Sequence, residues 1–337
     1  MRFLLDDEQR AFAHSLDALL SAADTPSVVR SWGAGDHTAG RALWSRIADA
    51  GVFALAVPEA YEGVGPLPVE LAVAFVELGR HAVPGPLVET VTAAALLTEP
   101  GLAKRFLPGL ASGETIATVA AFDGPYSSHG PYSSHGSYAL DGDAATIHLA
   151  VEGGELRLAQ AHGPGRGHGP VRTSMDPARR LTRLEKAGGE VLATGPQVAA
   201  AAAHALTWAR LATAAQALGV GLTLLDRTVA YVRQRSQFGV PIGSFQAVKH
   251  RLADAKVALE FARPLLLGAA LTMDPADVAA AKVTACEAAY TTARTALQLH
   301  GAIGYTAEYD LSLWLTKARA LRTAWGTPGE CRETVLR

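Results

Sequence analysis

Cysteine is scarce in this sequence: among 337 residues only Cys286 and Cys331 are cysteines. Two isolated cysteines predict neither a disulfide framework nor a zinc site, because both need several cysteines at short spacings. The chain also has no excess of either charge, since 30 Lys and Arg are matched by 32 Asp and Glu, for a formal net charge of -2. A protein that neutralises nucleic-acid phosphates needs a clustered basic excess, so nucleic acid is not expected as a partner.

Long uninterrupted apolar segments are absent as well. Arg, His or Asp breaks each of them within about 18 residues, so no membrane span is expected. The chain reaches acid at Asp6 and Asp7, too early for the apolar stretch of a signal peptide, and we therefore expect a cytoplasmic protein. Apolar side chains as such are abundant: 49% of the residues are hydrophobic. That composition excludes a disordered chain, and the length favours two or three domains.

Three compositional zones predict the domain organisation. Residues 1–112 show helical apolar spacing, with acid at 6–8 where a helix macrodipole favours it. Residues 113–193 are rich in Gly, His, Ser and Pro and contain alternating strand patterns such as 155–160. Residues 194–337 predict four long helices, at 196–234, from 245 onward with a possible break at Pro264, at 275–300 and at 308–325. The expected fold is mainly α with a small β domain (α+β): an N-terminal helical domain, a trimmed β-barrel-like middle domain and a C-terminal four-helix bundle.

The middle zone contains a tandem duplication. Residues 125–130 (Pro-Tyr-Ser-Ser-His-Gly) are repeated at once as 131–136, which is typical of an exposed loop that tolerates insertion. Four histidines lie in or near it: His129, His135, His162 and His168. No acidic or Cys ligand recurs there with fixed spacing, so no metal site is expected.

Three separated motifs resemble those of the acyl-CoA dehydrogenases, in the family's order. Residues 44–65 resemble its Trp…Gly-Val…Leu-x-Val-Pro-Glu segment, and residues 233–246 resemble its Arg-x-x-Phe-Gly…Phe-Gln signature. Residues 298–309 resemble its Gln-x-x-Gly-Gly-x-Gly-x-x-x-Glu-Tyr segment. The resemblance implies α,β-dehydrogenation of an acyl-CoA thioester, in which a carboxylate removes the α-proton and FAD accepts the β-hydride. It also implies an FAD shared across a subunit interface.

The residues that would hold the adenine and pyrophosphate side of a neighbour's FAD are present. The resemblance implies that Arg235 contacts the pyrophosphate, for which a guanidinium fork is suited, and that Phe238 and Gln246 line the adenosine half. Gln298 and Gly301 would let the backbone approach the dinucleotide. Ala302 stands where the family usually has a second glycine.

Both family positions for the catalytic base lack a carboxylate. An ungapped count from Glu308-Tyr309 aligns Trp325-Gly326-Thr327 with the family's Glu-Gly-Thr, and an indole cannot take up a proton. The alternative position on the first bundle helix is Ala209, just before Arg210. The middle zone also lacks the Thr-Glu-Pro-x-x-Gly-Ser-Asp and Lys-x-Trp-Ile-Thr segments that contact the flavin ring in the family, although 174–180 resembles its late Asp-x-x-Arg element.

This combination resembles the short, base-lacking subunits of the heteromeric α2β2 acyl-CoA dehydrogenases that actinobacteria use on steroid side-chain CoA thioesters. The resemblance implies a longer partner subunit that carries the glutamate, and inactivity of this chain alone. Two alternatives stay open. One is a self-sufficient enzyme with a displaced base, for which Glu308, Asp310 and Asp254 are candidates. The other is a flavin-free scaffold protein of the same fold.

Overall fold

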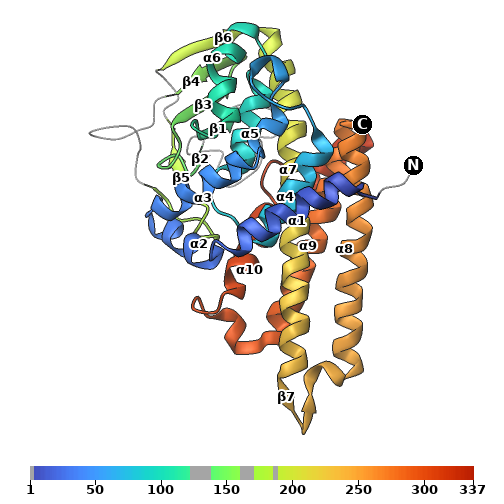
Figure 1. Cartoon of the computed structure of the whole chain (residues 1–337). Coiled ribbons are helices and arrows are strands. Elements are labelled where there is room, and N and C mark those ends of the chain that lie inside the picture. Colours follow the sequence, from blue (N-terminus) through green and yellow to red (C-terminus); the bar gives the residue numbers. More distant parts are fainter. Residues whose placement is uncertain (1–3, 122–137, 160–170, 185–188) are drawn as a thin grey trace. The chain divides into compact units, whose positions relative to one another are not determined.

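The computed structural model describes residues 4–121, 138–159, 171–184 and 189–337 (Figure 1). The duplicated segment 125–136 lies outside the described residues, as do the four histidines near it, so the loop and metal predictions stay predictions. By internal contacts the chain forms two units. The first comprises Met1–Ser27, Ala72–Val83 and Arg210–Arg337, and the second comprises Val28–Leu71 and Pro84–Ala209. The three sequence-based domains, 1–112, 113–193 and 194–337, remain a proposal.

The helices and strands follow the expected order of a helical region, a β region and long helices. The α-helices are α1 Asp7–Ser21, α2 Thr25–Ala34, α3 Thr38–Asp49, α4 Pro68–Arg80, α5 Leu87–Leu96, α6 Pro100–Ala111, α7 Pro196–Gln234, α8 Gln246–Thr272, α9 Pro275–His300, α10 Leu311–Leu321 and α11 Pro328–Leu336. The strands are β1 Ala117–Ala121, β2 Tyr138–Leu140, β3 Ile147–Glu152, β4 Glu155–Leu158, β5 Leu181–Arg183, β6 Glu190–Thr194, β7 Ser236–Gln237 and β8 Val240–Pro241. Short 3₁₀ turns are η1 Phe53–Ala56, η2 Glu59–Tyr61, η3 Ile242–Ser244 and η4 Gly301–Tyr305. The predicted fold class is confirmed.

Local capping explains several helix boundaries. The Asp6 side chain accepts from the backbone N–H of Gln9 and begins α1, so acid does open this helix. Asp274 caps α9, and Pro275 occupies its first turn, as predicted. Gly301 ends α9 with φ +64°, a conformation that disfavours side chains carrying a Cβ.

One prediction about the bundle is wrong, and a break that the sequence left open is absent. The fourth helix, expected over 308–325, is only α10, and Pro328 opens the short α11. Pro328 is tolerated there because Thr327 and Glu330 form a capping box and a proline at the first helical position needs no N–H partner. Pro264 does not divide α8, which continues through it as one helix. Leu259, Leu266 and Leu267 are buried along α8, and their packing offsets the lost hydrogen bond.

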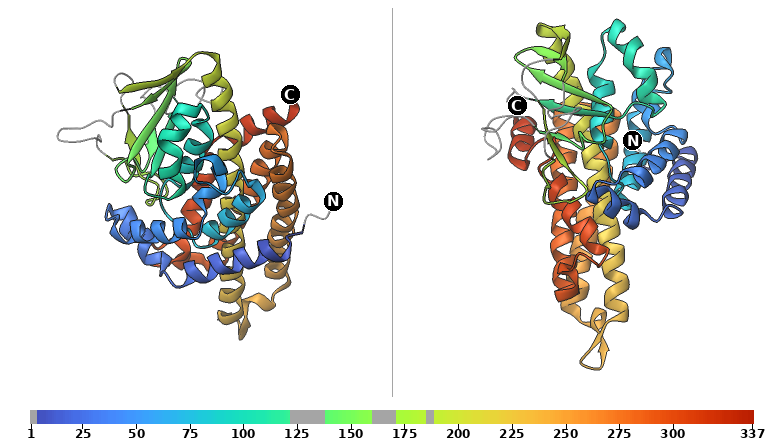
Figure 2. Two further views of the ribbon diagram at one scale, coloured as in Figure 1. Left: turned by 45° about the horizontal axis from the view of Figure 1, so that its top comes forward. Right: turned by 90° about the vertical axis from the view of Figure 1, so that its left-hand side faces the viewer.

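The second unit holds the β domain. Its larger sheet has the order β1-β3-β4-β6, with β1 parallel to β3 and the other pairs antiparallel, and a smaller sheet pairs β2 with β5. Helix α5 lies against β1, and Thr90 exchanges hydrogen bonds with the Ala117 backbone (Figure 2, left). Arg180 donates to Asp143 (2.6 Å) and to the Gly33 carbonyl (3.2 Å), which ties the strand region to α2.

The first unit is built around α7, α8, α9 and α10. Helices α7 and α8 run side by side, and the β7–β8 hairpin projects from the end where they are connected (Figure 1; Figure 2, right). The core contains Val220 and Leu224 of α7, Ala289 of α9 and Trp314 of α10. Helix α4 approaches α7 backbone to backbone: a Cβ added at Gly79 would lie 2.1 Å from the Gln216 oxygen, and one at Gly219 would lie 1.9 Å from the Val76 oxygen. Larger residues at these two glycines would separate the helices.

Glu77 is an acid on α4 that borders a small cavity. The cavity, of about 70 Å³, is lined mainly by apolar residues of α4, α7 and α8, and Arg263 also reaches it. Burial raises the pKa of Glu77 to about 7, with a further increase from Asp17, while Arg80 and Arg263 act in the opposite direction. As the pH rises, Glu77 therefore ionises at a lower pH in the unfolded chain than in the folded protein. The free energy of unfolding decreases for this reason between the usual pKa of 4.5 and about pH 7.

We predict that Glu77→Gln stabilises the protein at alkaline pH. Above pH 7 the variant no longer carries a buried carboxylate, so its free energy of unfolding should exceed that of wild type by about 1–3 kcal/mol. At pH 4 the two proteins should be equally stable, because Glu77 is then protonated in both states. Urea titrations at both pH values measure the difference, with the exposed Glu333→Gln as control. A variant no more stable than wild type at pH 8 would show that the Glu77 carboxylate does not destabilise the folded protein.

Candidate functional site

The Arg-x-x-Phe-Gly residues form the hairpin at the end of α7. Helix α7 ends at Gln234, and Arg235 leads into β7 while its carbonyl accepts from the Ile242 N–H (2.8 Å). Phe238 and Gly239 are the two turn residues, with φ of +55° and +81°. Two successive positive φ values define a turn whose twist suits a two-residue hairpin. The hairpin holds Arg235 and Phe238 at the surface, and Gln246 begins α8 immediately beyond it.

Phe238 combines two unfavourable features. Its ring is 90% exposed, and its backbone adopts the left-handed conformation, which is uncommon for a bulky residue. Phe245 gives it edge-on support, with ring centroids 6.3 Å apart. Strain of this kind persists where the surrounding structure imposes it, and it is concentrated at ligand sites. The hairpin therefore keeps the Phe238 ring exposed to solvent.

The second motif lies at the C-terminal end of α9. Gln298 is exposed in the last turn of the helix, and Gly301 and Ala302 are exposed at the start of η4. A Cβ at Gly301 would meet nothing within 4 Å, so the glycine is required by its backbone conformation and leaves open space above the chain. Both motifs lie at the same end of the bundle (Figure 1).

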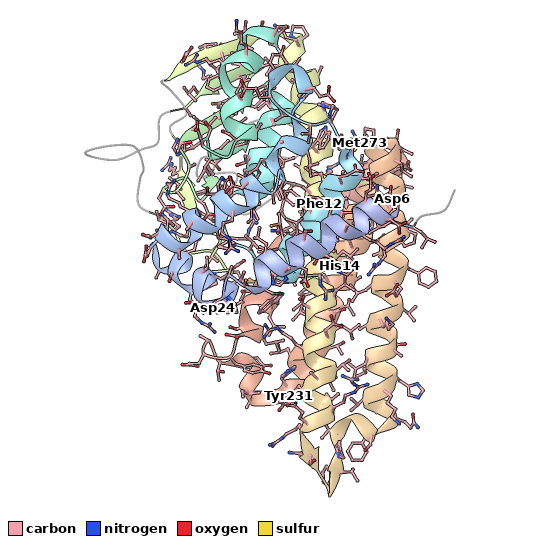
Figure 3. The ribbon with its side chains drawn as sticks, viewed as in Figure 1. Asp6, Phe12, His14, Asp24, Tyr231 and Met273 are labelled. Carbon is pink, nitrogen blue, oxygen red and sulfur yellow. The ribbon has the colours of Figure 1, made fainter. Side chains whose placement is uncertain are left out.

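A stack of aromatic rings connects the two motifs. Tyr231, labelled in Figure 3, projects from α7 one turn before Arg235, and its carbonyl accepts the Arg235 N–H (2.9 Å). Its ring stacks on His300 of α9, with ring centroids 4.1 Å apart and planes inclined by 24°. The structure thus links the hairpin and the Gly301 turn through half-buried Tyr231 and buried His300.

The residues at the two base positions are placed differently. Trp325 is half-buried in the turn after α10, in a left-handed conformation with φ +56°. Ala209 is fully buried in α7. The turn that contains Trp325 and the η4 turn lie at opposite ends of α10, whose 11 residues span about 16 Å. The Gly301 turn and Trp325 are therefore separate on this chain.

Two buried cations hold the Trp325 turn from beneath. Lys282 of α9, which is 0% exposed, donates to the carbonyls of Arg322 (3.0 Å) and Gly326. Arg210 of α7 donates through Nε to the Trp325 carbonyl (3.2 Å) and through Nη1 to the Thr334 hydroxyl (3.3 Å). The last carbonyls of a helix have no partner within it, and here lysine and arginine supply the donors. These bonds fix the backbone that carries the indole.

The chemistry of the motif residues fits one end of FAD. An exposed guanidinium can pair with phosphate oxygens, an exposed aromatic ring can stack on a base, and a glycine with open space above it permits close backbone approach. Arg235, Phe238 and Gly301 are exposed residues of these three kinds, and Gln246, Gln298 and Ala302 are exposed as well. How these six predicted residues act stays a proposal.

Sequence reasoning missed Lys282, Tyr231 and His300. Lys282 lies in an Ala-rich helix, where nothing in the local pattern separates a buried lysine from a solvated one. The sequence does point to Tyr231 and His300, because Tyr231 lies four residues before Arg235 and His300 lies within the motif at 298–309. Their contact, however, depends on the tertiary pairing of α7 with α9.

Comparisons with known proteins agree with the motifs. The N-terminal domain of acyl-CoA dehydrogenases matches residues 6–114, and their C-terminal domain matches residues 199–337. Acyl-CoA dehydrogenase IpdE2 of Mycobacterium tuberculosis (strain ATCC 25618 / H37Rv) is 33% identical over 326 residues, which cover 96% of this chain and 95% of that protein. The chain belongs to the acyl-CoA dehydrogenase family, whose members are FAD-dependent oxidoreductases acting on CH–CH groups.

Two solved structures share the whole fold. The ChsE4-ChsE5 complex from Mycobacterium tuberculosis superposes with a TM-score of 0.81 at 28% identity, over 99% of this chain and 97% of that one. A Tcur3481-Tcur3483 steroid ACAD variant gives a TM-score of 0.80 at 25% identity, over 98% of this chain and 96% of that one. In the described part of this chain, no helix has the length and hydropathy needed to cross a membrane.

We predict that Lys282→Met destabilises the protein. The substitution keeps the length of the side chain but removes its donors, which leaves the Arg322 and Gly326 carbonyls unsatisfied, at a cost of about 2–4 kcal/mol. Chemical denaturation measures the loss, and Lys256→Met on the exposed face of α8 is the matched control. If the two variants unfold at the same denaturant concentration, Lys282 does not hold this turn.

Proposed function

We propose that this chain is one subunit of a heteromeric FAD-dependent acyl-CoA dehydrogenase. In the proposed α2β2 assembly, the chain contributes the adenine and pyrophosphate side of the FAD site through Arg235, Phe238, Gln246, Gln298, Gly301 and Ala302. A longer partner subunit supplies the catalytic glutamate. The reaction is α,β-dehydrogenation of an acyl-CoA thioester, and this chain is inactive alone.

The observation that carries the proposal is the asymmetry between the two groups of residues. The exposed hairpin and the Gly301 turn carry the chemistry for a dinucleotide, whereas Trp325 and Ala209 stand where a base is expected. An indole N–H donates a hydrogen bond and has no basic site, and a methyl group has no polar atom at all. Proton abstraction therefore requires a carboxylate from elsewhere.

This chain's own residues bind and orient in the proposed reaction. Arg235 neutralises pyrophosphate charge, and Phe238 offers a ring for the adenine to stack on. The chemistry supplied by bound FAD is acceptance of the β-hydride. Neither of these roles requires a residue of this chain to transfer a proton.

The relatives support a heteromer and a steroid substrate. Both solved relatives are named as two proteins together, ChsE4-ChsE5 and Tcur3481-Tcur3483, and the second is called a steroid ACAD. The identities of 28% and 25% over nearly the whole chain extend the likeness beyond one motif. We propose a steroid side-chain CoA thioester as the substrate class.

The first alternative is a self-sufficient enzyme with a displaced base. Asp310 lies 3.9 Å from Arg227 in an ion pair, Glu308 is exposed near η4, and Asp254 is exposed on α8. If one of these carboxylates were the base, its amide variant would abolish turnover by the pure chain. The second alternative, a flavin-free scaffold, is distinguished by the visible spectrum of the purified protein.

We predict that the pure chain, supplied with FAD, oxidises no acyl-CoA. Co-expression with a longer acyl-CoA dehydrogenase chain that has an intact glutamate should restore turnover, measured by reduction of an artificial electron acceptor with steroid side-chain CoA thioesters.

In that complex Arg235→Gln should lower the amount of FAD that is retained, because the cation proposed to face the pyrophosphate is lost. The exposed Arg332→Gln on α11 is the matched control. Turnover by the pure chain would refute the proposal.

A further inference from the structure

The geometry around His300 fixes the tautomer of its ring. Nδ1 lies 2.8 Å from the Ala296 carbonyl oxygen, and a carbonyl can only accept, so Nδ1 carries the hydrogen. Nε2 then holds a lone pair, and it finds no hydrogen-bond partner among the described residues. The residue is 4% exposed. A proton on Nε2 would place a charged donor where no acceptor meets it, so the ring is kept neutral.

The neutral ring joins three segments of the first unit. It stacks on Tyr231 of α7, and Tyr309, just before α10, contacts it with ring centroids 5.6 Å apart. The η4 turn begins directly after His300 and packs on it, since a Cβ added at Gly304 would lie 3.2 Å from the His300 Cβ. His300 therefore packs between α7 and the η4 turn.

The contact between His300 and Tyr231 is connected to the Arg235 hairpin through the backbone. The Tyr231 carbonyl accepts the Arg235 N–H, and the Arg235 carbonyl accepts the Ile242 N–H. The Tyr231 hydroxyl also donates to the His300 carbonyl (3.5 Å). A displacement of the imidazole would thus shift Tyr231 and, with it, the backbone that presents the Arg235 guanidinium.

We propose that His300 is a positioning residue for dinucleotide binding. Its neutral ring fixes the η4 turn, Gly301–Tyr305, against α7 and so sets Arg235 relative to the backbone of Gly301 and Ala302. The cofactor part of this inference rests on the proposed function, whereas the positioning of the turn does not.

The packing of the η4 turn on His300 should depend on pH. The titratable side chains in ring contact with His300 are Tyr231 and Tyr309. The elements that carry these two rings also carry charged groups: the ion pairs Arg227–Asp310 and Asp226–Arg80, Arg233 near the end of α7, and Lys317 and Arg319 on α10. Burial lowers the pKa of His300, and its hydrogen bond to Ala296 offsets only part of this. When the η4 turn detaches from His300, the exposed imidazole takes up a proton as the pH falls below its usual pKa of 6.5. The packed arrangement of turn and ring therefore loses stability below pH 6.5 and is unaffected above it.

Amide hydrogen exchange on the full chain tests the proposal. Corrected for intrinsic rates, protection of 301–305 and of 235–242 should fall up to about tenfold between pH 8 and pH 5.5. His300→Phe keeps the stacking but cannot titrate, so its protection should be the same at both pH values. His300→Ala should lose protection of both segments at both. The control is His250→Phe at an exposed site on α8, which should behave as wild type.

The outcomes separate the two claims. If His300→Phe keeps the pH dependence, or if His300→Ala leaves segment 235–242 unchanged, His300 does not position these segments. FAD affinity is measured in the complex with the longer subunit. If the competent turn falls to a tenth of the population in His300→Ala, the Kd should rise about tenfold. Loss of protection with unchanged FAD affinity would contradict the proposed FAD surface while leaving the positioning role of His300 intact.

Discussion

The turn that follows α10 depends on two buried cations. Lys282 and Arg210 donate to the backbone oxygens of Arg322, Trp325 and Gly326. The last carbonyls of a helix have no partner within the helix itself, so donors from other helices can satisfy them. Both donors lie on long bundle helices, so the turn is fixed by the core of the first unit rather than by its own side chains. Lys317 and Trp314 of α10 serve the end of α4 in the same manner, through the carbonyls of Val83 and Arg80. Buried donors thus hold α10 at its start and its end, and α10 in turn separates the Gly301 turn from the Trp325 turn.

Two aromatic residues occupy left-handed backbone, and both stand at positions that the motifs identify. Phe238 and Trp325 have φ of +55° and +56°, where a small residue would be less strained. Each is followed by a glycine with positive φ, so the strain is concentrated in a two-residue turn. The hairpin turn leaves its ring exposed to solvent, whereas the cation-held turn keeps its ring half-buried. The first arrangement suits recognition of a flat ligand. The second places an indole at the position where the resemblance to the family predicts a base.

The sequence predicted most of the fold, because capping residues and apolar spacing define α1, α7 and α9 locally. It failed at Pro328, which opens a helix instead of ending one. It left open a break at Pro264, which α8 tolerates because its apolar face is buried. For the site, motif spacing identified Arg235 and Gly301 as candidates, and the structure has both directly after the ends of long helices. The sequence could not identify the residues that support the turns. Tyr231 and His300 connect the hairpin with the Gly301 turn, and Lys282 supports the Trp325 turn, through contacts between helices distant in sequence.

The central claim is that this chain binds FAD for a partner and operates no flavin of its own. The most direct test is the ratio of flavin to protein in the complex purified with its longer subunit, obtained from the flavin absorbance and quantitative amino-acid analysis. We expect half as many flavins as protein chains, because in the proposed assembly each FAD would lie between two unlike subunits. One flavin for every chain, or a flavin retained by this chain alone, would contradict it.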